Sequence, residues 1–179
     1  SSVRKYTKAG VLVIQRNLMA DAPTNKDQIN GLCLKDGILY VSCAKNVNGT
    51  ATSWVAEYNP DTLTPLAVRT LSINAFSEGL QFAHGHWWVC FHASKFVARF
   101  TTAWALVDTH SLSFQVTGPV HGYGPDKGYD ALVWDGDDLL LNIHEIYDQA
   151  NVDRYRWNGS SFAQGARLAE PTTKATQGM

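Results

Sequence analysis

Two pairs of side chains in this sequence have types and spacings suited to chemistry. His84 and His86 form a His-x-His pair, a spacing that can place two zinc ligands on one side of a strand. His144 and Glu145 are adjacent, as a general acid and base would be. No third ligand at a recognisable spacing accompanies the histidine pair. We therefore expect His84 and His86 to be exposed turn residues, and His144 and Glu145 to begin a polar loop.

Three oxygen-bearing side chains occupy equivalent places in the chain. Asn30, Glu78 and Asp130 each stand directly before an apolar segment. Two interpretations are open for them. Their side chains either hydrogen-bond the backbone where each strand begins, or present oxygen ligands on one face of the molecule.

The segments that would position these side chains recur three times. Residues 31–43, 79–91 and 131–143 resemble one another, and their starts are 48 and 52 residues apart. Self-similarity at such a period indicates a repeat architecture. Each segment reads as a short strand, a glycine-containing turn and a second apolar strand, which is a hairpin signal. The predicted turns are Asp36-Gly37, His84-Gly85 and Asp135-Gly136.

Further strands extend each repeat. Residues 54–58, 96–100 and 151–155 alternate in the manner of a half-exposed third strand, and residues 66–71 illustrate a fourth. Four antiparallel strands in about 50 residues are typical of a β-propeller blade. Residues 3–10 parallel residues 152–159, so the chain begins with the second half of a blade.

The predicted fold is therefore all-β and propeller-like, with about three and a half four-stranded antiparallel blades in one domain of 179 residues. The predicted segments are a half blade at 3–16, blades at 31–73, 79–116 and 129–168, and a tail at 169–179. An open blade edge is a liability in solution. Three possibilities are open: the half blade and the tail close a small four-bladed ring, two or more copies complete one ring, or the chain is a fragment of a longer one or docks on other subunits. We expect another chain, a second copy or the tail to cover the open edge and complete the ring.

The motifs resemble a known group of propellers. The pattern Glu-Gly-Leu, Gly and Trp-Val within 78–89, with Tyr-Asn-Pro-Asp-Thr-Leu at 58–63, is similar to blades of NHL-repeat, YncE-like and SMP-30-like proteins. In SMP-30-like lactonases, acidic and amide side chains before the innermost strands hold a divalent cation such as Ca²⁺. The resemblance thus implies Asn30, Glu78 and Asp130 as ligands of a cation that would polarise a lactone carbonyl.

The longest loop, residues 117–128, is a candidate binding loop. It contains four glycines and two prolines, together with His121, Tyr123 and Lys127. It lacks the Gly-Lys-Ser/Thr of a phosphate-binding loop. An exposed tyrosine on a shaped loop suits recognition of a protein or a glycan, and a plain connector is the alternative. His144 and Glu145 are expected on the same face.

Composition excludes several classes. The net charge is −1, which argues against nucleic acid as a partner. The longest apolar run, residues 10–14, is too short to span a membrane, so we expect a soluble protein. The three cysteines are Cys33, Cys43 and Cys90, and the first hairpin places Cys33 opposite Tyr40. We expect a fold that does not depend on disulfides.

No nucleophile motif or metalloprotease motif appears. The leading hypothesis is a non-catalytic propeller module for binding or assembly, as a structural or attachment component of a larger complex such as a virion or a cell-surface particle. It needs no cofactor. The alternatives are a metal-dependent hydrolase of the lactonase-like kind, using Asn30, Glu78 and Asp130, and a carbohydrate-binding lectin.

Overall fold

The protein is built from antiparallel β-sheets. The structure is a computed structural model, and it describes residues 2–18, 28–47, 50–92, 96–113, 129–143, 152–166 and 168. These residues form one two-stranded and three four-stranded sheets and contain no α-helix, so the all-β prediction is confirmed. In this described part, no helix long and apolar enough to cross a membrane was found. The chain divides into two compact units, Ser1–Ser77 and Glu78–Met179.

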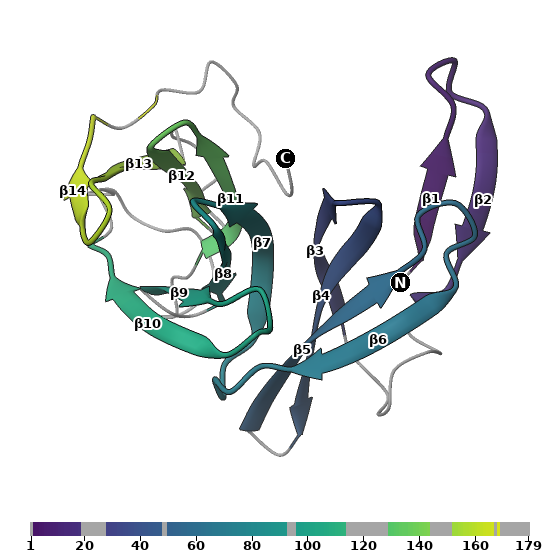
Figure 1. The fold of residues 1–179 in the computed structure, drawn as a ribbon, viewed down its shortest axis with the longest axis horizontal. Helices are drawn as coiled ribbons and strands as arrows, with labels where there is room; N and C mark the ends of the chain where they lie inside the picture. The colour runs from purple at the N-terminus through teal and green to yellow at the C-terminus, as the bar shows by residue number, and fades with distance from the viewer. Residues whose placement is uncertain are drawn as a thin grey trace, which may run out of the picture. The chain divides into compact units, whose positions relative to one another are not determined.

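The first unit contains a hairpin and a four-stranded sheet (Figure 1). Each strand pairs with the one before it in the chain, so the four-stranded sheet is a simple meander. The hairpin strands are β1 (Val3–Tyr6) and β2 (Leu12–Arg16). The sheet strands are β3 (Gln28–Lys35), β4 (Ile38–Val47), β5 (Thr50–Tyr58) and β6 (Pro65–Thr70).

The second unit contains two four-stranded meanders of the same order. The strands of one are β7 (Ser77–Ala83), β8 (His86–Phe91), β9 (Phe96–Phe100) and β10 (Leu106–Ser111). Those of the other are β11 (Tyr129–Asp135), β12 (Asp138–Ile143), β13 (Val152–Trp157) and β14 (Phe162–Gln164). All three four-stranded sheets therefore begin with one of the repeated hairpins.

Two of the three hairpin turns lie where the sequence predicted them, and the third differs. The φ values are 48° at Asp36 and 74° at Gly37, and 51° at His84 and 76° at Gly85. Two successive positive φ angles are those of a type I′ turn. In the third hairpin Asp135 pairs with Asp138, so the turn is Gly136-Asp137 and not the predicted Asp135-Gly136. Only Gly136 has a positive φ there, as in a type II′ turn.

The β1–β2 hairpin has the same turn as β9–β10. The Thr7 N–H donates to the Val11 carbonyl and the Gly10 N–H to the Thr7 carbonyl, at 2.9 and 3.0 Å. Thr101 and the residues after it repeat this pattern, with Trp104 donating to the Thr101 carbonyl at 3.0 Å. Tyr6 and Phe100, the residues before these threonines, therefore occupy equivalent positions.

A hydrophobic core joins β1–β2 to one face of the β3–β6 sheet. Its buried members from the sheet lie on β4 and β5, and Leu63 lies in the turn after β5. Val3 and Leu18 pack on them, with Ile14 of β2 at the margin. The buried residues are Val3, Leu18, Val41, Cys43, Ala56, Tyr58 and Leu63.

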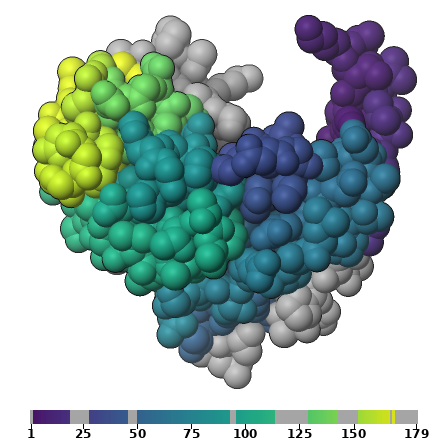
Figure 2. All heavy atoms as spheres, in the orientation of Figure 1, coloured from purple at the N-terminus to yellow at the C-terminus, as the bar shows by residue number. Residues whose placement is uncertain are grey.

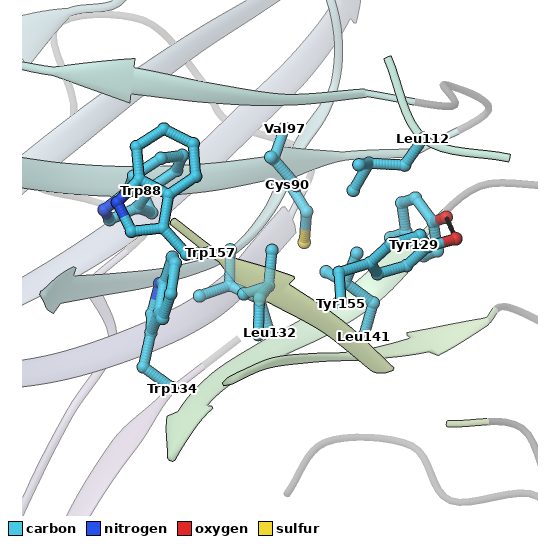
Figure 3. Close-up of a cluster of buried hydrophobic side chains, with 11 residues drawn as sticks. Trp88, Cys90, Val97, Leu112, Tyr129, Leu132, Trp134, Leu141, Tyr155 and Trp157 are labelled. Carbon is cyan, nitrogen blue, oxygen red and sulfur yellow. Dashed lines mark hydrogen bonds between the residues drawn. The ribbon is translucent and has the colours of Figure 1, made fainter. Parts of the chain in front are cut away.

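A larger, aromatic core fills the space between the two sheets of the second unit (Figure 3). Trp88 of β8 is at its centre, with ring centroids 5.0 Å from Trp134 and 5.2 Å from Trp157. Tyr129 and Tyr155 lie at the other end, where their hydroxyls are hydrogen-bonded. Cys90 lies between these two groups, and so this thiol is part of the core.

The cysteines form no disulfide. None of Cys33, Cys43 and Cys90 takes part in a disulfide bond. Cys33 pairs across the hairpin with Tyr40, as predicted, and so cannot bridge to Cys43. The described fold therefore depends on core packing and not on covalent cross-links.

Candidate metal centre

One group of side chains in the described residues could hold a metal ion. It consists of Glu78 on β7, Asp130 on β11 and His92, the residue after β8. In an antiparallel hairpin the start of the first strand lies beside the end of the second. The β7–β8 hairpin therefore brings Glu78 and His92 together, and β11 brings Asp130 alongside.

The three side chains converge closely. His92 Nδ1 lies 3.6 Å from Glu78 Oε1 and 3.9 Å from Asp130 Oδ1. One ligand atom from each residue lies within 4.8 Å of the other two. The two carboxylates are mostly buried, whereas the His92 side chain is 33% exposed. The group is thus partly desolvated and still open to solvent on the histidine side.

A β-bulge places Asp130 in the group. Tyr129 pairs with Ile143 and Ala131 pairs with Asn142, so Asp130 is the additional residue on its strand. Bulges redirect a side chain out of the regular alternation and are common next to functional sites. The same irregularity occurs in β3, where Asn30 lies between the paired residues Ile29 and Gly31. The equivalence predicted for these two positions is therefore a real structural one.

A close approach of two strands supports this geometry. A Cβ atom added at Gly79 would lie 2.7 Å from the backbone nitrogen of Leu132. Contacts this short do not occur, so only glycine allows β7 to lie so near β11. Because Glu78 precedes Gly79, and Asp130 is two residues before Leu132, the close approach also determines how near the two carboxylates are.

The carboxylates of Glu78 and Asp130 affect the pKa of a nearby buried thiol, that of Cys90. Burial raises the pKa of Cys90, and the negative charges of Glu78 and Asp130 raise this pKa further. The Cys90 thiol donates a hydrogen bond to the Gly79 carbonyl at 3.7 Å. Cys90 belongs to the hydrophobic core, and its thiol is not among the ligand atoms that converge in the group of Glu78, His92 and Asp130.

Asn30, the third oxygen donor expected from the sequence, has a structural role in the first unit. Its amide Nδ2 donates to the Ser77 carbonyl at 2.8 Å. Ser77 is held further by its hydroxyl, which donates to the Cys43 carbonyl, and by its N–H, which donates to the Ser53 hydroxyl. This bond agrees with the backbone-tether interpretation of Asn30, and the ligand interpretation of Glu78 and Asp130 stays a prediction.

Sequence reasoning missed His92 as a member of this group. The available signal was its position, because His92 directly follows the second strand of its hairpin, as His144 follows Ile143 in the next repeat. A residue at that position faces the start of the first strand.

The other predicted ligand-binding residues lie outside the described residues. They are His121, Tyr123, Lys127, His144 and Glu145. The interpretation of the 117–128 loop as a protein-binding or glycan-binding loop therefore stays a prediction.

His84 is an exposed turn residue, as predicted, whereas His86 is half-buried and is the first residue of β8. His84 Nε2 donates to the Gly136 carbonyl at 3.1 Å, and His86 Nδ1 donates to the His84 carbonyl at 2.9 Å. Both rings thus contact backbone carbonyls. They line an open surface cleft of about 450 Å³ together with Arg99, Asp137, Trp157, Asn158 and Gly159.

Comparisons with known proteins concern the fold alone. No protein-family model matches this sequence, and no curated protein matches it. A crystal structure of a protein of unknown function from Bacteroides caccae is similar, with a TM-score of 0.60 at 14% identity. The similarity covers 93% of this chain and 53% of that one, so the chain spans about half the length of this neighbour.

Proposed function

We propose that this chain is a β-propeller module that binds its ligand through a divalent cation held by Glu78, His92 and Asp130. The propeller architecture is supported by three meander sheets of one order, each starting with the repeated hairpin. The packing of β11–β14 on β7–β10 is the face-to-face stacking that successive blades require. The blade boundaries remain those of the sequence repeat, with a half blade formed by β1 and β2.

The observation that carries the binding proposal is the convergence of three ligand atoms from three separate places in the chain. Ligand atoms around one Zn²⁺ in a tetrahedral site lie roughly 3.4 Å apart, given bond lengths of about 2.1 Å. The two distances from His92 Nδ1, 3.6 and 3.9 Å, need little adjustment to reach this value. The donor set therefore fits a metal ion.

The donor types favour a transition metal. Carboxylate oxygens alone suit Ca²⁺ and Mg²⁺, whereas an imidazole nitrogen suits Zn²⁺ and its neighbours. Two carboxylates and one imidazole point to Zn²⁺ or Mn²⁺ in preference to the Ca²⁺ that the family resemblance implies. A cation also offsets the repulsion between the mostly buried carboxylates of Glu78 and Asp130.

Three protein ligands leave coordination positions for another molecule, and this favours hydrolysis as a second candidate function. Catalytic zinc sites commonly have three protein ligands, whereas structural sites are closed. A bound cation would polarise a carbonyl oxygen and lower the pKa of a water molecule. The partly exposed His92 side marks where a carbonyl ligand would approach. In both candidate functions Glu78 on β7 and Asp130 on β11 would hold the cation in place.

The experiment is a thermal-unfolding titration of the metal-stripped chain with ZnCl₂, MnCl₂ and CaCl₂. A ligand present at 100 times its Kd stabilises the folded state by about 2.7 kcal/mol. We expect Zn²⁺ or Mn²⁺ to raise Tm, and Glu78→Gln or Asp130→Asn to remove most of this effect. Asp135→Asn, an exposed carboxylate on the same strand as Asp130, is the matched control and should keep the response.

Absence of stabilisation by all three cations would contradict the proposal, as would an equal response in Glu78→Gln. Hydrolysis is tested separately, by following lactone opening with the loaded chain and with Asp130→Asn. Cation binding without lactone opening supports the binding module and rejects the hydrolase.

A further inference from the structure

The open cleft beside His84 and His86 is a second place in the second unit where polar side chains gather. Its volume of about 450 Å³ lies within the range of about 300–1,000 Å³ that small-molecule sites occupy. Glu78 lies near the start of β7 and His84 directly follows its end, so this cleft and the candidate metal centre lie at opposite ends of one strand. Figure 2 shows the strands of the second unit, in teal, green and yellow, at the surface.

Two sheets form the walls of the cleft. One wall comes from β8, β9 and the turn before β8, and the other from the turns that follow β11 and β13. The hydrogen bond from His84 Nε2 to the Gly136 carbonyl joins the two walls. Within the second wall, the Trp157 N–H donates to the Asp137 carbonyl at 2.8 Å. Backbone and side-chain bonds thus fix both sides of the cleft.

Arg99 is held in place by charge and by aromatic rings. Its Nε donates to Asp108 Oδ1 at 3.0 Å, and its Nη2 donates to Asp108 Oδ2. Its guanidinium carbon lies 5.6 Å from the ring centroid of Trp88 and 5.3 Å from that of Trp157, within the reach of a cation–π interaction. His110 Nε2 donates to the same Asp108 carboxylate at 3.1 Å. A side chain fixed in this way loses little entropy when it binds a ligand.

The fixed guanidinium supplies hydrogen-bond donors to the cleft. Arginine has five N–H donors, and the described bonds of Arg99 go through Nε and Nη2 to Asp108. The two N–H groups of Nη1 take part in none of these bonds. They are therefore available to a ligand in the cleft that Arg99 lines.

The two imidazoles and Asp137 supply acceptors. A carbonyl oxygen only accepts, so His84 carries a hydrogen on Nε2 and His86 carries one on Nδ1. In the neutral rings the remaining nitrogens, His84 Nδ1 and His86 Nε2, are acceptors. The Asp137 side chain is 62% exposed and adds its carboxylate oxygens to the lining. Donors and acceptors thus face the same space.

The charges around the cleft disfavour a charged ligand. The positive charge of Arg99 is paired with the negative charge of Asp108, and Asp137 adds a second carboxylate. An anion would be repelled by Asp137, and a cation would be repelled by Arg99. A neutral ligand meets neither repulsion. A hydroxyl group both donates and accepts, so a neutral molecule with several hydroxyls can use both kinds of group.

We propose that this cleft binds a pyranose, either as a free sugar or as the terminal residue of a glycan. The sugar hydroxyls accept hydrogen bonds from Arg99 Nη1 and donate to Asp137 and to His86 Nε2. The Trp157 indole, which lines the cleft, contacts the C–H groups of the ring. This site goes beyond the proposed function, since it requires neither a cation nor the propeller architecture.

The test is a titration of the ¹⁵N-labelled chain, with and without EDTA, using the methyl glycosides of glucose, galactose, mannose and N-acetylglucosamine. Three glycines, Gly85, Gly136 and Gly159, lie in the turns around the cleft, and Gly37 lies in the equivalent turn of the first unit. We expect at least one glycoside at millimolar concentration to shift the amide signals of these three glycines and to leave that of Gly37 unchanged. EDTA should not alter these shifts.

Substitutions at the accessible part of the lining test the assigned hydrogen bonds. Asp137→Ala and His86→Ala should each weaken binding by about tenfold, because each removes an acceptor for a sugar hydroxyl. Asp135→Ala is the matched control, since this carboxylate is exposed near the same turn and does not line the cleft. It should keep the affinity of the unmodified chain. An unchanged pattern of the other amide signals shows that a variant is folded, and Asp137→Ala decides if His86→Ala does not fold.

A glycan array distinguishes the two sources of the sugar. Oligosaccharides that bind at least about tenfold more tightly than the matching methyl glycoside support a glycan, and equal affinities support a free sugar.

The proposal is overturned if none of the four glycosides shifts the three glycine signals. It is also overturned if sodium sulfate shifts them and the glycosides do not, which would identify an anion site. Equal losses in Asp135→Ala and Asp137→Ala would contradict the assigned contacts. Shifts that EDTA abolishes would place the sugar at the candidate metal centre, so failure of this proposal is distinguishable from failure of the proposed function.

Discussion

Leu132 on β11 and Leu32 on β3 occupy the same place in the repeated hairpin, yet the first is buried and the second is exposed. Their local sequences are alike, and both strands pair with the next strand of their sheet. The difference comes from what packs on them, because β7 and β8 cover Leu132 and no described strand covers Leu32. Burial in a repeat protein is thus a property of the neighbouring repeat.

Replacing each of the two leucines by alanine should give the largest difference in the free energy of unfolding. Leu132→Ala removes buried methyl groups and leaves a cavity, which costs about 2–5 kcal/mol of unfolding free energy. Leu32→Ala removes an exposed side chain and should change stability by less than about 0.5 kcal/mol. Urea unfolding followed by tryptophan fluorescence measures both. Equal losses would show that Leu32 is covered in solution and would break the comparison.

A smaller loss of stability is expected at Gly79 of β7, where this strand lies very close to β11. In Gly79→Ala the new Cβ would meet the Leu132 backbone, which cannot move like a flexible side chain. Overpacking of this kind costs about 1–3 kcal/mol. The displaced strand carries Glu78, so the Tm increase produced by Zn²⁺ or Mn²⁺ should also fall. Full stability in Gly79→Ala would mean that β7 lies further from β11 than described.

The smallest effect concerns two equivalent tyrosines. Tyr155 donates a hydrogen bond to the Ser113 carbonyl and accepts one from Tyr129, whereas Tyr6 is half exposed. Tyr155→Phe leaves these partners unsatisfied and should cost about 1–2 kcal/mol. Tyr6→Phe should be nearly neutral. Chemical unfolding at pH 7 compares the two variants.

Alkaline pH gives a second measure of the same contrast. Burial raises the pKa of Tyr155 to about 12, so folding favours the protonated phenol. An unfolded tyrosine has a pKa near 10, and the folded state therefore loses stability as pH rises from about 10 to about 12. Tyr155→Phe should show a shallower decline over this range in unfolding free energy. An unchanged decline would assign the alkaline transition to other groups.

The candidate site was only partly predictable. Glu78 and Asp130 were found because they share a position relative to a recognisable hairpin, which is a local pattern. His92 was missed, since its closeness to them depends on pairing across the β7–β8 hairpin and on the approach of β11. Asn30 shares the pattern, and in the structure its amide donates to the Ser77 carbonyl, a contact that the local pattern does not specify.

The sequence by itself determined the strands, their meander order and two of three hairpin turns, because alternation and glycine turns act over a few residues. The third predicted turn, Asp135-Gly136, was wrong, since Trp-Asp-Gly-Asp-Asp also allows the observed turn Gly136-Asp137. Tertiary structure decided how β11 pairs with β12. With the turn at Gly136-Asp137, Leu139 of β12 lies opposite Trp134 of β11 and also opposite Tyr155 of β13, so that all three side chains enter the core. It also decided that Leu132 is buried and Leu32 is not, because burial requires a second sheet that no local pattern specifies.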